Sequence, residues 1–316
     1  MNSTGRFTKE LKRLRGASYD ECSSCGAKLP KDVAAYAGYD KNGAPLYVGN
    51  CCLYRVDELA SHIYWWWTAD KRVDPSEKLW RYVDFAKFID LLETRSLFFS
   101  RADKFDDVFE GASGLAERQI EWDNYYLEYF KNAVRLPPEN APSPAEEVVE
   151  REAMRLLNDI KRTIENERRT TFVSCWHSNS GESEALWRLY CPNGSTGILI
   201  ETTADRLIGS LDASDIELGR VKYIDFKTSF SGFHDRIFWK RKSLAHECEV
   251  RAVTKMHFKE DSGGLSRLID IEQLCVSVIP SPFAGAWFPK LVESVVSRYG
   301  YNIPVGKSEL LGEPFF

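Results

Sequence analysis

Residues 79–100 read LWRYVDFAKFIDLLETRSLFFS, and this stretch decides the fold of the main domain. Its two ends, 79–83 and 96–100, are short runs rich in apolar and aromatic residues, which is typical of strands. Between them, residues 85–92 place their apolar side chains at helical spacing. The stretch therefore predicts a strand, a helix and a second strand.

The rest of the chain adds further helices and strands to this unit. Residues 136–144 contain four prolines and predict an exposed loop or hinge between two helices. Because strands far apart in the sequence must come together, the fold class is α+β, with a mixed, mainly antiparallel sheet core and flanking helices. The periodicity predicts helices over 112–135, 145–169 and 183–190, and strands over 170–177, 197–201, 221–224, 247–253 and near 274–280.

The composition excludes several classes of protein. The chain has 316 residues with 42 Lys and Arg against 47 Asp and Glu, a net charge of −5. This balance argues against a generally basic protein that coats nucleic acid. No apolar run approaches the roughly 20 residues that cross a bilayer, and the N-terminus lacks the apolar segment of a secretory signal. We therefore expect a cytoplasmic protein that does not contact a membrane.

The beginning of the chain differs from the rest in charge. The first fifteen residues contain five basic side chains and a single acid, Glu10. A solvated tail explains this asymmetry, and so does an arm that steers toward phosphates. We expect residues 1–72 to form this basic arm and a small module, and residues 73–316 to form the α+β domain.

Four of the eight cysteines fall within the N-terminal module. Cys22 and Cys25 form a CxxC pair followed by Gly26, a spacing that lets two thiolates bind one ion. Residues 36–48 read as a strand, a turn and a strand, a hairpin that would return Cys51 and Cys52 to the first pair. The pattern predicts a structural zinc in a zinc-ribbon-like module.

The second half of this ligand set is irregular, and two alternatives remain open. Adjacent cysteines on an extended chain point in opposite directions, so one of Cys51 and Cys52 need not bind the ion. His62 is then the substitute ligand. The other interpretation is four buried thiols without a metal. With or without zinc, the module can serve as a contact surface for a protein partner or a nucleic acid.

Polar residues alternate along the strand predicted over 247–253. Glu247, Glu249 and Arg251 share one face, and Cys248, Val250 and Ala252 share the other. Two carboxylates and an arginine in this arrangement can orient a ribose or a phosphate. They can also make cross-strand ion pairs on a solvated sheet.

Other chemistry-bearing residues carry weaker signals. His177 ends a strand and is either a general base or a hydrogen-bonded structural residue. The chain contains no P-loop, no GxGxxG, no HExxH and no kinase signature, so the ordinary nucleotide-binding and metalloprotease interpretations lose their support.

The order of several segments resembles the bacterial domain of unknown function 2971 family over roughly residues 79–253. Where this chain has Asp106-Asp107-Val108, the family usually has Asn-Asp-Pro, and the cysteine module lies outside the family core. The segments that carry the resemblance are LWRY (79–82), LFFS leading to FDDVFEG (97–111), FVSCW (172–176), WRLY with GILI (187–200), and Lys242 with ECEVR (247–251).

The opening of that family is also similar to the first third of ADP-ribosyltransferase-type toxins, which transfer ADP-ribose from NAD. The resemblance implies that Arg81 holds NAD, that Ser174 supports the nicotinamide ring, and that Glu249, with Glu247 as the alternative, stabilises the oxocarbenium-like transition state. The aromatic and basic residues expected to contact NAD are Tyr82, Trp176, Trp187, Tyr190 and Arg251. The implied function is a bacterial effector or antiphage defence protein, an ADP-ribosyltransferase-like toxin.

The sequence is also compatible with two other functions. In the first, Asp106, Asp107, Glu110, Glu247 and Glu249 gather a divalent cation that cleaves nucleic acid. In the second, the chain is a non-catalytic sensor or interaction protein of a defence system, in which the zinc module forms the contact surface.

We predict that a strong chelator removes about one zinc ion per chain and unfolds the N-terminal module, because a sulfur-rich site supplies much of the folding free energy of so small a unit. Metal analysis with a chromogenic zinc indicator measures the release. Cys275→Ser, which changes a cysteine far from the module, should leave the zinc content unchanged. A metal-free and fully folded preparation would contradict the prediction.

Overall fold

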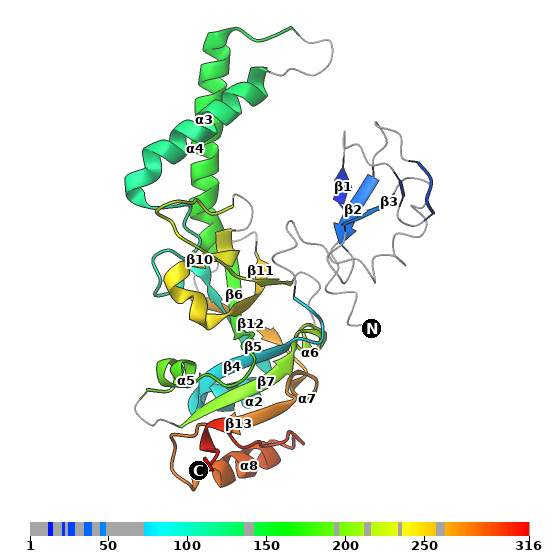
Figure 1. Ribbon diagram of the computed structural model, residues 1–316, viewed down its shortest axis with the longest axis vertical. Helices are drawn as coiled ribbons and strands as arrows, with labels where there is room; N and C mark the ends of the chain where they lie inside the picture. Colours follow the sequence, from blue (N-terminus) through cyan, green and yellow to red (C-terminus); the bar gives the residue numbers. More distant parts are fainter. Residues whose placement is uncertain are drawn as a thin grey trace.

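The main domain is an α+β structure built on a mainly antiparallel sheet, as the sequence predicts (Figure 1). The computed structural model describes residues 73–135, 142–192, 196–211, 216–232, 236–256 and 263–315. In the N-terminal region it describes the short segments 12–14, 21–22, 25–28, 35–39 and 45–48.

The strand, helix and strand predicted over 79–100 are present. Strand β4 (Lys78–Asp84) leads into helix α2 (Phe85–Thr94), and strand β5 (Ser96–Arg101) follows. The side chain of Asp84 caps α2 by accepting a hydrogen bond from the Lys87 amide at 2.8 Å. Arg95 ends the helix in the left-handed conformation, with φ of 51°. This unit is therefore set by local signals.

The large sheet brings strands from the whole domain together. Its order is β12 (Gly264–Leu268), β5, β6 (Thr171–His177), β4, β7 (Gly197–Thr203) and β13 (Ser277–Pro280). Strand β11 (Glu249–Lys255) pairs with β6 and with β8 (Glu217–Arg220). His177 on β6 lies opposite Trp80 of β4 and Glu249 of β11, so these three strands meet at one position.

Strands β4 and β5 diverge along the same edge of β6. Strand β5 pairs with β6 only at Phe172 and Val173, and β4 pairs with it only at His177. The other edge of β6 is paired with β11 along its whole length. Residues 174–176 therefore have no strand partner, within the described strands, on the side where β4 and β5 separate.

The two faces of the sheet carry separate cores. Helices α2, α6 (Ala204–Ser210), α7 (Ile271–Leu274) and α8 (Phe288–Arg298) supply buried side chains to one face, including Phe88 and Phe288. Helix α5 (Glu184–Tyr190) covers the opposite face, where Trp187 packs with Trp80 and Tyr82.

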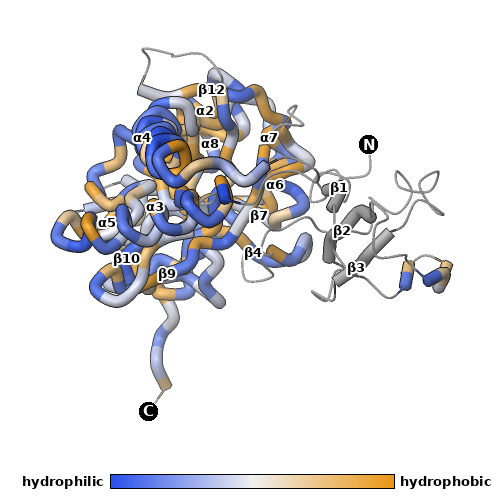
Figure 2. Tube along the Cα trace, turned by 90° about the horizontal axis from the view of Figure 1, so that it is seen from above, coloured by the Kyte–Doolittle hydropathy of each residue, from blue (hydrophilic) through white to orange (hydrophobic). Residues whose placement is uncertain are grey.

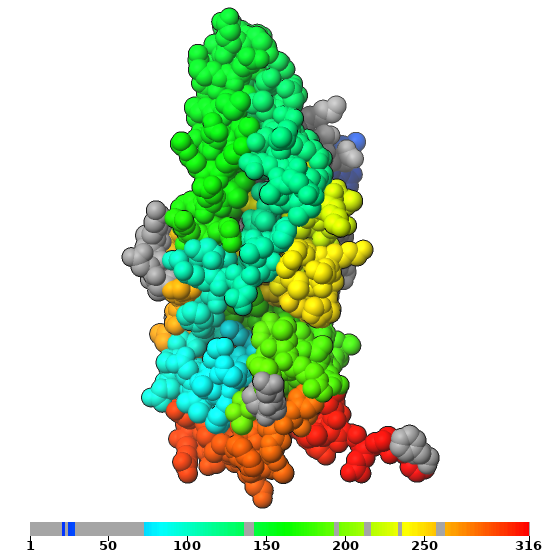
Figure 3. Space-filling view, turned by 90° about the vertical axis from the view of Figure 1, so that its left-hand side faces the viewer, coloured from blue at the N-terminus to red at the C-terminus, as the bar shows by residue number. Residues whose placement is uncertain are grey.

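Two long helices form an arm that projects from the sheet (Figures 1 and 3). They are α3 (Gln119–Arg135) and α4 (Glu146–Thr170), and Trp122, Leu157 and Ile160 form the small core between them. Most of the surface of α4 is hydrophilic (Figure 2). The proline-rich link predicted between these helices falls largely outside the described residues.

Several predicted boundaries need correction. The helix predicted from residue 112 begins at Gln119, after the 3-10 turn Ala116–Arg118. The strand predicted over 221–224 is present as β9 (Lys222–Ile224), which pairs in parallel with β10 (Trp239–Arg241), whereas β8 just before it was not predicted. The strand predicted from residue 247 begins at Glu249, because Cys248 adopts the left-handed conformation with φ of 43°.

The described part of the N-terminal region contains a small antiparallel sheet. Strands β2 (Ala35–Tyr39) and β3 (Pro45–Val48) pair as the hairpin that the sequence predicts, and β1 (Lys12–Leu14) pairs with β2. Among the helices of the described ranges, none combines the length and apolar character needed to cross a membrane.

We predict that Phe88→Ala lowers the free energy of unfolding by about 3–5 kcal/mol, because Phe88 is fully buried between α2 and the sheet. Urea denaturation measures the loss. The matched control is Asp90→Ala on the exposed face of the same helix, which should change stability by no more than about 0.5 kcal/mol. Equal effects of the two substitutions would contradict the assigned helix orientation.

Candidate functional site

Arg81 lies where β4 and β5 separate along β6. Its Nη1 donates a hydrogen bond to the Ser174 hydroxyl at 2.5 Å, and its Nη2 donates to the Phe98 carbonyl at 3.5 Å. The guanidinium carbon is 5.5 Å from the ring centre of Trp176, whose indole nitrogen also donates to Ser174, at 3.2 Å. Burial lowers the pKa of Arg81. Three predicted site residues, Arg81, Ser174 and Trp176, therefore form one cluster.

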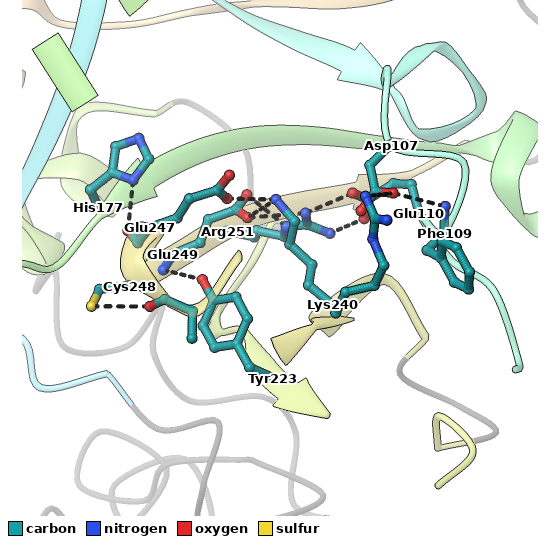
Figure 4. Close-up of polar contacts among 12 residues, drawn as sticks. Asp107, Phe109, Glu110, His177, Tyr223, Lys240, Glu247, Cys248, Glu249 and Arg251 are labelled. Atoms are coloured by element: carbon teal, nitrogen blue, oxygen red, sulfur yellow. Dashed lines mark hydrogen bonds and ion pairs between the residues drawn. The ribbon is translucent and has the colours of Figure 1, made fainter. Parts of the chain in front are cut away.

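Arg251 is the centre of a second, fully buried cluster (Figure 4). It donates to Glu249 through Nε at 2.8 Å and through Nη2 at 3.1 Å. It also donates to both carboxylate oxygens of Glu110 and to the Ile237 carbonyl. All five guanidinium hydrogens are thus used, which offsets the cost of burying the charge.

Lys240 connects this cluster to Glu247. The Lys240 ammonium lies 3.0 Å from Oε2 of Glu249 and 2.6 Å from Oε2 of Glu247. Both oxygens of Glu249 are therefore bound by cations. Oε1 of Glu247 has no hydrogen-bond partner among the described residues. Glu247 therefore differs from Glu249 in that only one of its carboxylate oxygens contacts a cation of the protein.

The charges of this cluster determine how its members titrate. Burial alone would raise the pKa of Glu249, but Arg251 and Lys240 outweigh burial and lower it to about 2. Burial would likewise lower the pKa of Lys240, but Glu249 and Glu247 hold it above its usual value. The charged forms of Glu249 and Lys240 are therefore stable near neutral pH.

His177 adjoins the Glu247 end of the cluster. Its Nδ1 lies 2.8 Å from the Glu247 carbonyl, and because a carbonyl only accepts, Nδ1 carries the hydrogen. Burial lowers the pKa of His177, so its imidazole is neutral near pH 7. The lone pair is consequently on Nε2.

Aromatic side chains border His177. The Tyr82 ring contacts Trp187 edge-on at 5.0 Å and stacks with Tyr190 at 6.3 Å. The hydroxyl of Tyr82 accepts a hydrogen bond from the Ser183 amide at 2.9 Å, and burial raises the pKa of Tyr82 to about 12. Trp187 is fully buried, whereas Tyr190 is 39% exposed. Of these three residues, Tyr190 is the one that a ligand can reach directly.

The two clusters lie on opposite faces of the central strands. Ser174 and Trp176 alternate with Cys175 along β6, and Arg251 is in register with Cys175. Arg81 and Glu249 therefore do not share a face. They nevertheless act on a common neighbour: burial raises the pKa of Tyr190, Glu247 and Glu249 raise it further, and Arg81 lowers it. The Tyr190 hydroxyl lies within electrostatic range of both clusters.

The polar face of β11 is buried, whereas one sequence-based interpretation placed it on a solvated sheet. Glu249 and Arg251 do make ion pairs, but the strand is buried on both faces from Glu249 to Thr254. The reason is that Glu110 from the loop after β5 and Lys240 from β10 cover the polar face. Glu110 was predicted only as a possible metal ligand, and its place beside Arg251 could not be predicted because the two residues are 141 positions apart.

Of the predicted metal ligands, Cys22 and Cys25 are the ones that lie within the described residues. The Gly26 amide donates to the Cys22 carbonyl at 2.8 Å, and the Cys22 amide donates to the Ala27 carbonyl at 2.8 Å. Gly26 has φ of 71°, the positive value expected for the glycine of a metal-binding turn. This turn fits a zinc site that uses Cys22 and Cys25. The remaining predicted ligands, Cys51, Cys52 and His62, lie outside the described residues.

Comparison of the chain with protein-family models, with curated proteins and with solved structures finds no match in any of the three. The resemblance to the domain of unknown function 2971 family therefore stays a prediction.

We predict that Arg251→Met lowers the free energy of unfolding by about 3–5 kcal/mol, because it leaves Glu110 and Glu249 buried without their cation. Chemical denaturation provides the measurement. The control is Arg155→Met on the exposed face of α4, where ion pairs with Glu152 and Asp159 contribute less than about 1 kcal/mol. A small effect at Arg251 would show that the network is not needed for folding.

The lowered pKa of Glu249 predicts a specific dependence of stability on pH. A carboxylate with an ordinary pKa of 4.5 in the unfolded chain and about 2 in the folded chain favours folding above pH 4.5. This contribution is lost as the pH falls from about 5 toward 2. We expect Glu249→Gln to be less stable at pH 7 and to show a shallower decline with acid in denaturation series. Parallel pH curves for the two proteins would contradict the assigned pKa.

Proposed function

We propose that this chain is an NAD-dependent ADP-ribosyltransferase-like effector whose reactive carboxylate is Glu247. The observation that carries the proposal is the meeting of β4, β6 and β11 at His177. These are the early, middle and late strands on which the resemblance distributes the functional residues. Glu247, directly before β11, supplies a carboxylate oxygen that is not bound by a cation of the protein.

The proposed role of Arg81 is to bind the pyrophosphate of NAD through the gap between β4 and β5, because Arg81 lies on the face of β6 opposite Glu249 and the Glu247 carboxylate would otherwise be out of reach of the same ligand. Its guanidinium is already oriented by Ser174 and by the Phe98 carbonyl, and it lies where β4 and β5 diverge. An arginine held in this way can bind two phosphate oxygens at once. Ser174 and Trp176 then act as positioning residues for Arg81, and Tyr190 offers an accessible ring for nicotinamide.

The proposed reaction breaks the bond between C1′ of the ribose and the nicotinamide nitrogen. The bonding electron pair leaves with nicotinamide, and positive charge develops on the ribose. Glu247 stabilises that charge, and the acceptor then bonds to C1′ and gives its proton to Glu247. Glu249 is already neutralised by Arg251 and Lys240, so its role is to hold Lys240 in place beside Glu247.

The metal-dependent nuclease alternative receives less support. Four of the five carboxylates that would gather a divalent ion face a cation of the protein, and among them Glu249 pairs with Arg251 and Lys240. Asp107 pairs with Arg241, Glu110 pairs with Arg251, and Glu247 pairs with Lys240. Among the residues that the structure describes, no group of three or more ligating side chains converges on a common point.

We predict that Glu247→Gln abolishes transfer of label from NAD to cellular protein or RNA, lowering the rate by at least about a hundredfold. The assay incubates the full chain with labelled NAD and a cellular extract, and also measures release of nicotinamide. Glu293→Gln, at an exposed glutamate on α8, is the matched control and should keep full activity.

Two parallel measurements separate the other functions. Incubation with RNA and magnesium or manganese, without NAD, tests for cleavage. Cleavage without label transfer would support the nuclease, and neither activity would support the non-catalytic sensor. A thermal unfolding curve for Glu247→Gln guards against misfolding as the cause of lost activity. Full activity in a folded Glu247→Gln protein would overturn the assignment of Glu247.

A further inference from the structure

A groove lies on the side of β10 that faces away from the acidic cluster. Successive residues of a strand point in opposite directions. Lys240 points to Glu247 and Glu249, and the next residue, Arg241, lines the groove. The cavity volume is about 550 Å³, which lies within the usual range for small-molecule sites. The groove is therefore distinct from the site proposed above.

Aromatic and aliphatic side chains form one wall of this groove. The rings of Phe109 and Phe226 lie 5.2 Å apart with an angle of 35° between their planes. Leu115 and Ile224 add aliphatic side chains to the lining of the groove. Phe226 is buried and Phe109 is half-buried, so Phe109 supplies most of the ring surface that this wall exposes. Such a wall accommodates a flat, apolar ring.

Basic side chains form the rim. Lys227, Arg241 and Lys242 line the groove together with one acid, Asp225. The carboxylate of Asp225 accepts a hydrogen bond from the Lys227 backbone amide at 2.9 Å, within its own turn. The rim therefore carries an excess of positive charge beside the aromatic wall.

Arg241 has unused hydrogen-bonding capacity at this rim. One of its terminal nitrogens, Nη2, lies 2.9 Å from Oδ1 of Asp107, and its guanidinium lies 5.0 Å from the Phe109 ring centre. The Arg241 Nε and the second carboxylate oxygen of Asp107 are both buried without a hydrogen-bond partner. The Asp107 oxygen needs a donor and does not favour an anion, so the group that can meet a phosphate is the Arg241 guanidinium, whose side chain is 41% exposed.

We propose that this groove binds a nucleoside phosphate. The base packs against the wall formed by Phe109 and Phe226, and the phosphate contacts Arg241 and Lys242. A ligand with a base but no phosphate would leave Arg241 and Lys242 without an anionic partner. A phosphate without a base would leave the aromatic wall exposed to water. A ligand that carries both groups matches the whole groove. The inference does not depend on Glu247 or on NAD cleavage.

The test is calorimetric titration of the full chain with ADP. We expect ADP to bind at least about tenfold more tightly than adenosine or inorganic pyrophosphate, because each of these lacks one half of the match. Lys242→Ala should weaken ADP binding by about tenfold, since it removes one charge-assisted contact. Lys290→Ala, at an exposed lysine on α8, should leave the affinity unchanged.

Phe109→Leu tests the aromatic wall separately. It should weaken ADP by about tenfold and leave the weak binding of pyrophosphate unchanged, a pattern that general unfolding would not give. The proposal is overturned if ADP binds no better than pyrophosphate, or if Lys242→Ala and Lys290→Ala have the same affinity for ADP as the unmodified chain.

Further titrations distinguish the source of the nucleotide. Displacement of ADP by NAD would support nucleotide binding in the groove and would identify a dinucleotide as a ligand. Binding of a short RNA in the absence of any ADP binding would overturn the proposal in favour of a nucleic-acid surface. Glu247→Gln should bind ADP normally, so loss of transfer activity and loss of the groove are measured independently.

Discussion

The burial of the Arg251 guanidinium between Glu110 and Glu249 is the interaction on which the rest of the candidate site depends. A charge in the interior is stable only when its hydrogen-bonding groups are satisfied. Arg251 meets this condition with partners from the loop after β5, from its own strand and from the carbonyl of Ile237. Three segments that are distant in the sequence are therefore fixed relative to one another by one side chain.

The second constraint is the left-handed backbone conformation of Cys248, which turns the chain so that Glu249 can reach Arg251. Glu249 must point toward Arg251, and Glu247 must also reach Lys240. In a continuous extended strand the two glutamates would be separated along one face. The left-handed conformation of Cys248, which is costly for a residue other than glycine, ends the 3-10 turn Lys242–Glu247 and starts β11. This conformation allows the carboxylates of Glu247 and Glu249 to contact the same Lys240 ammonium group, and these contacts offset the backbone strain at Cys248.

The sequence predicted the local structure well and the site less well, for a physical reason. The unit of β4, α2 and β5 depends on short-range periodicity and on the cap at Asp84, both of which can be read directly. The alternation of Glu249 and Arg251 with Val250 was also predictable. The partners of that polar face were not, because Glu110 lies 141 positions away from Arg251 and nothing local indicates their contact. The same limit explains why the resemblance assigned Arg81 and Glu249 to one NAD site although they lie on opposite faces of the central strands.

The charge balance of the buried cluster determines which end of it can do chemistry. Three carboxylates, Glu110, Glu247 and Glu249, face two cations, Lys240 and Arg251. Glu110 and Glu249 use their oxygens on Arg251, and Lys240 is shared by Glu249 and Glu247. The uncompensated negative charge therefore resides mainly at Glu247. An enzyme that must stabilise positive charge on a ribose needs such an excess, and a purely structural ion-pair network would be expected to balance its charges. The surplus carboxylate beside neutral His177 and exposed Tyr190 is thus the feature that a structural role leaves unexplained.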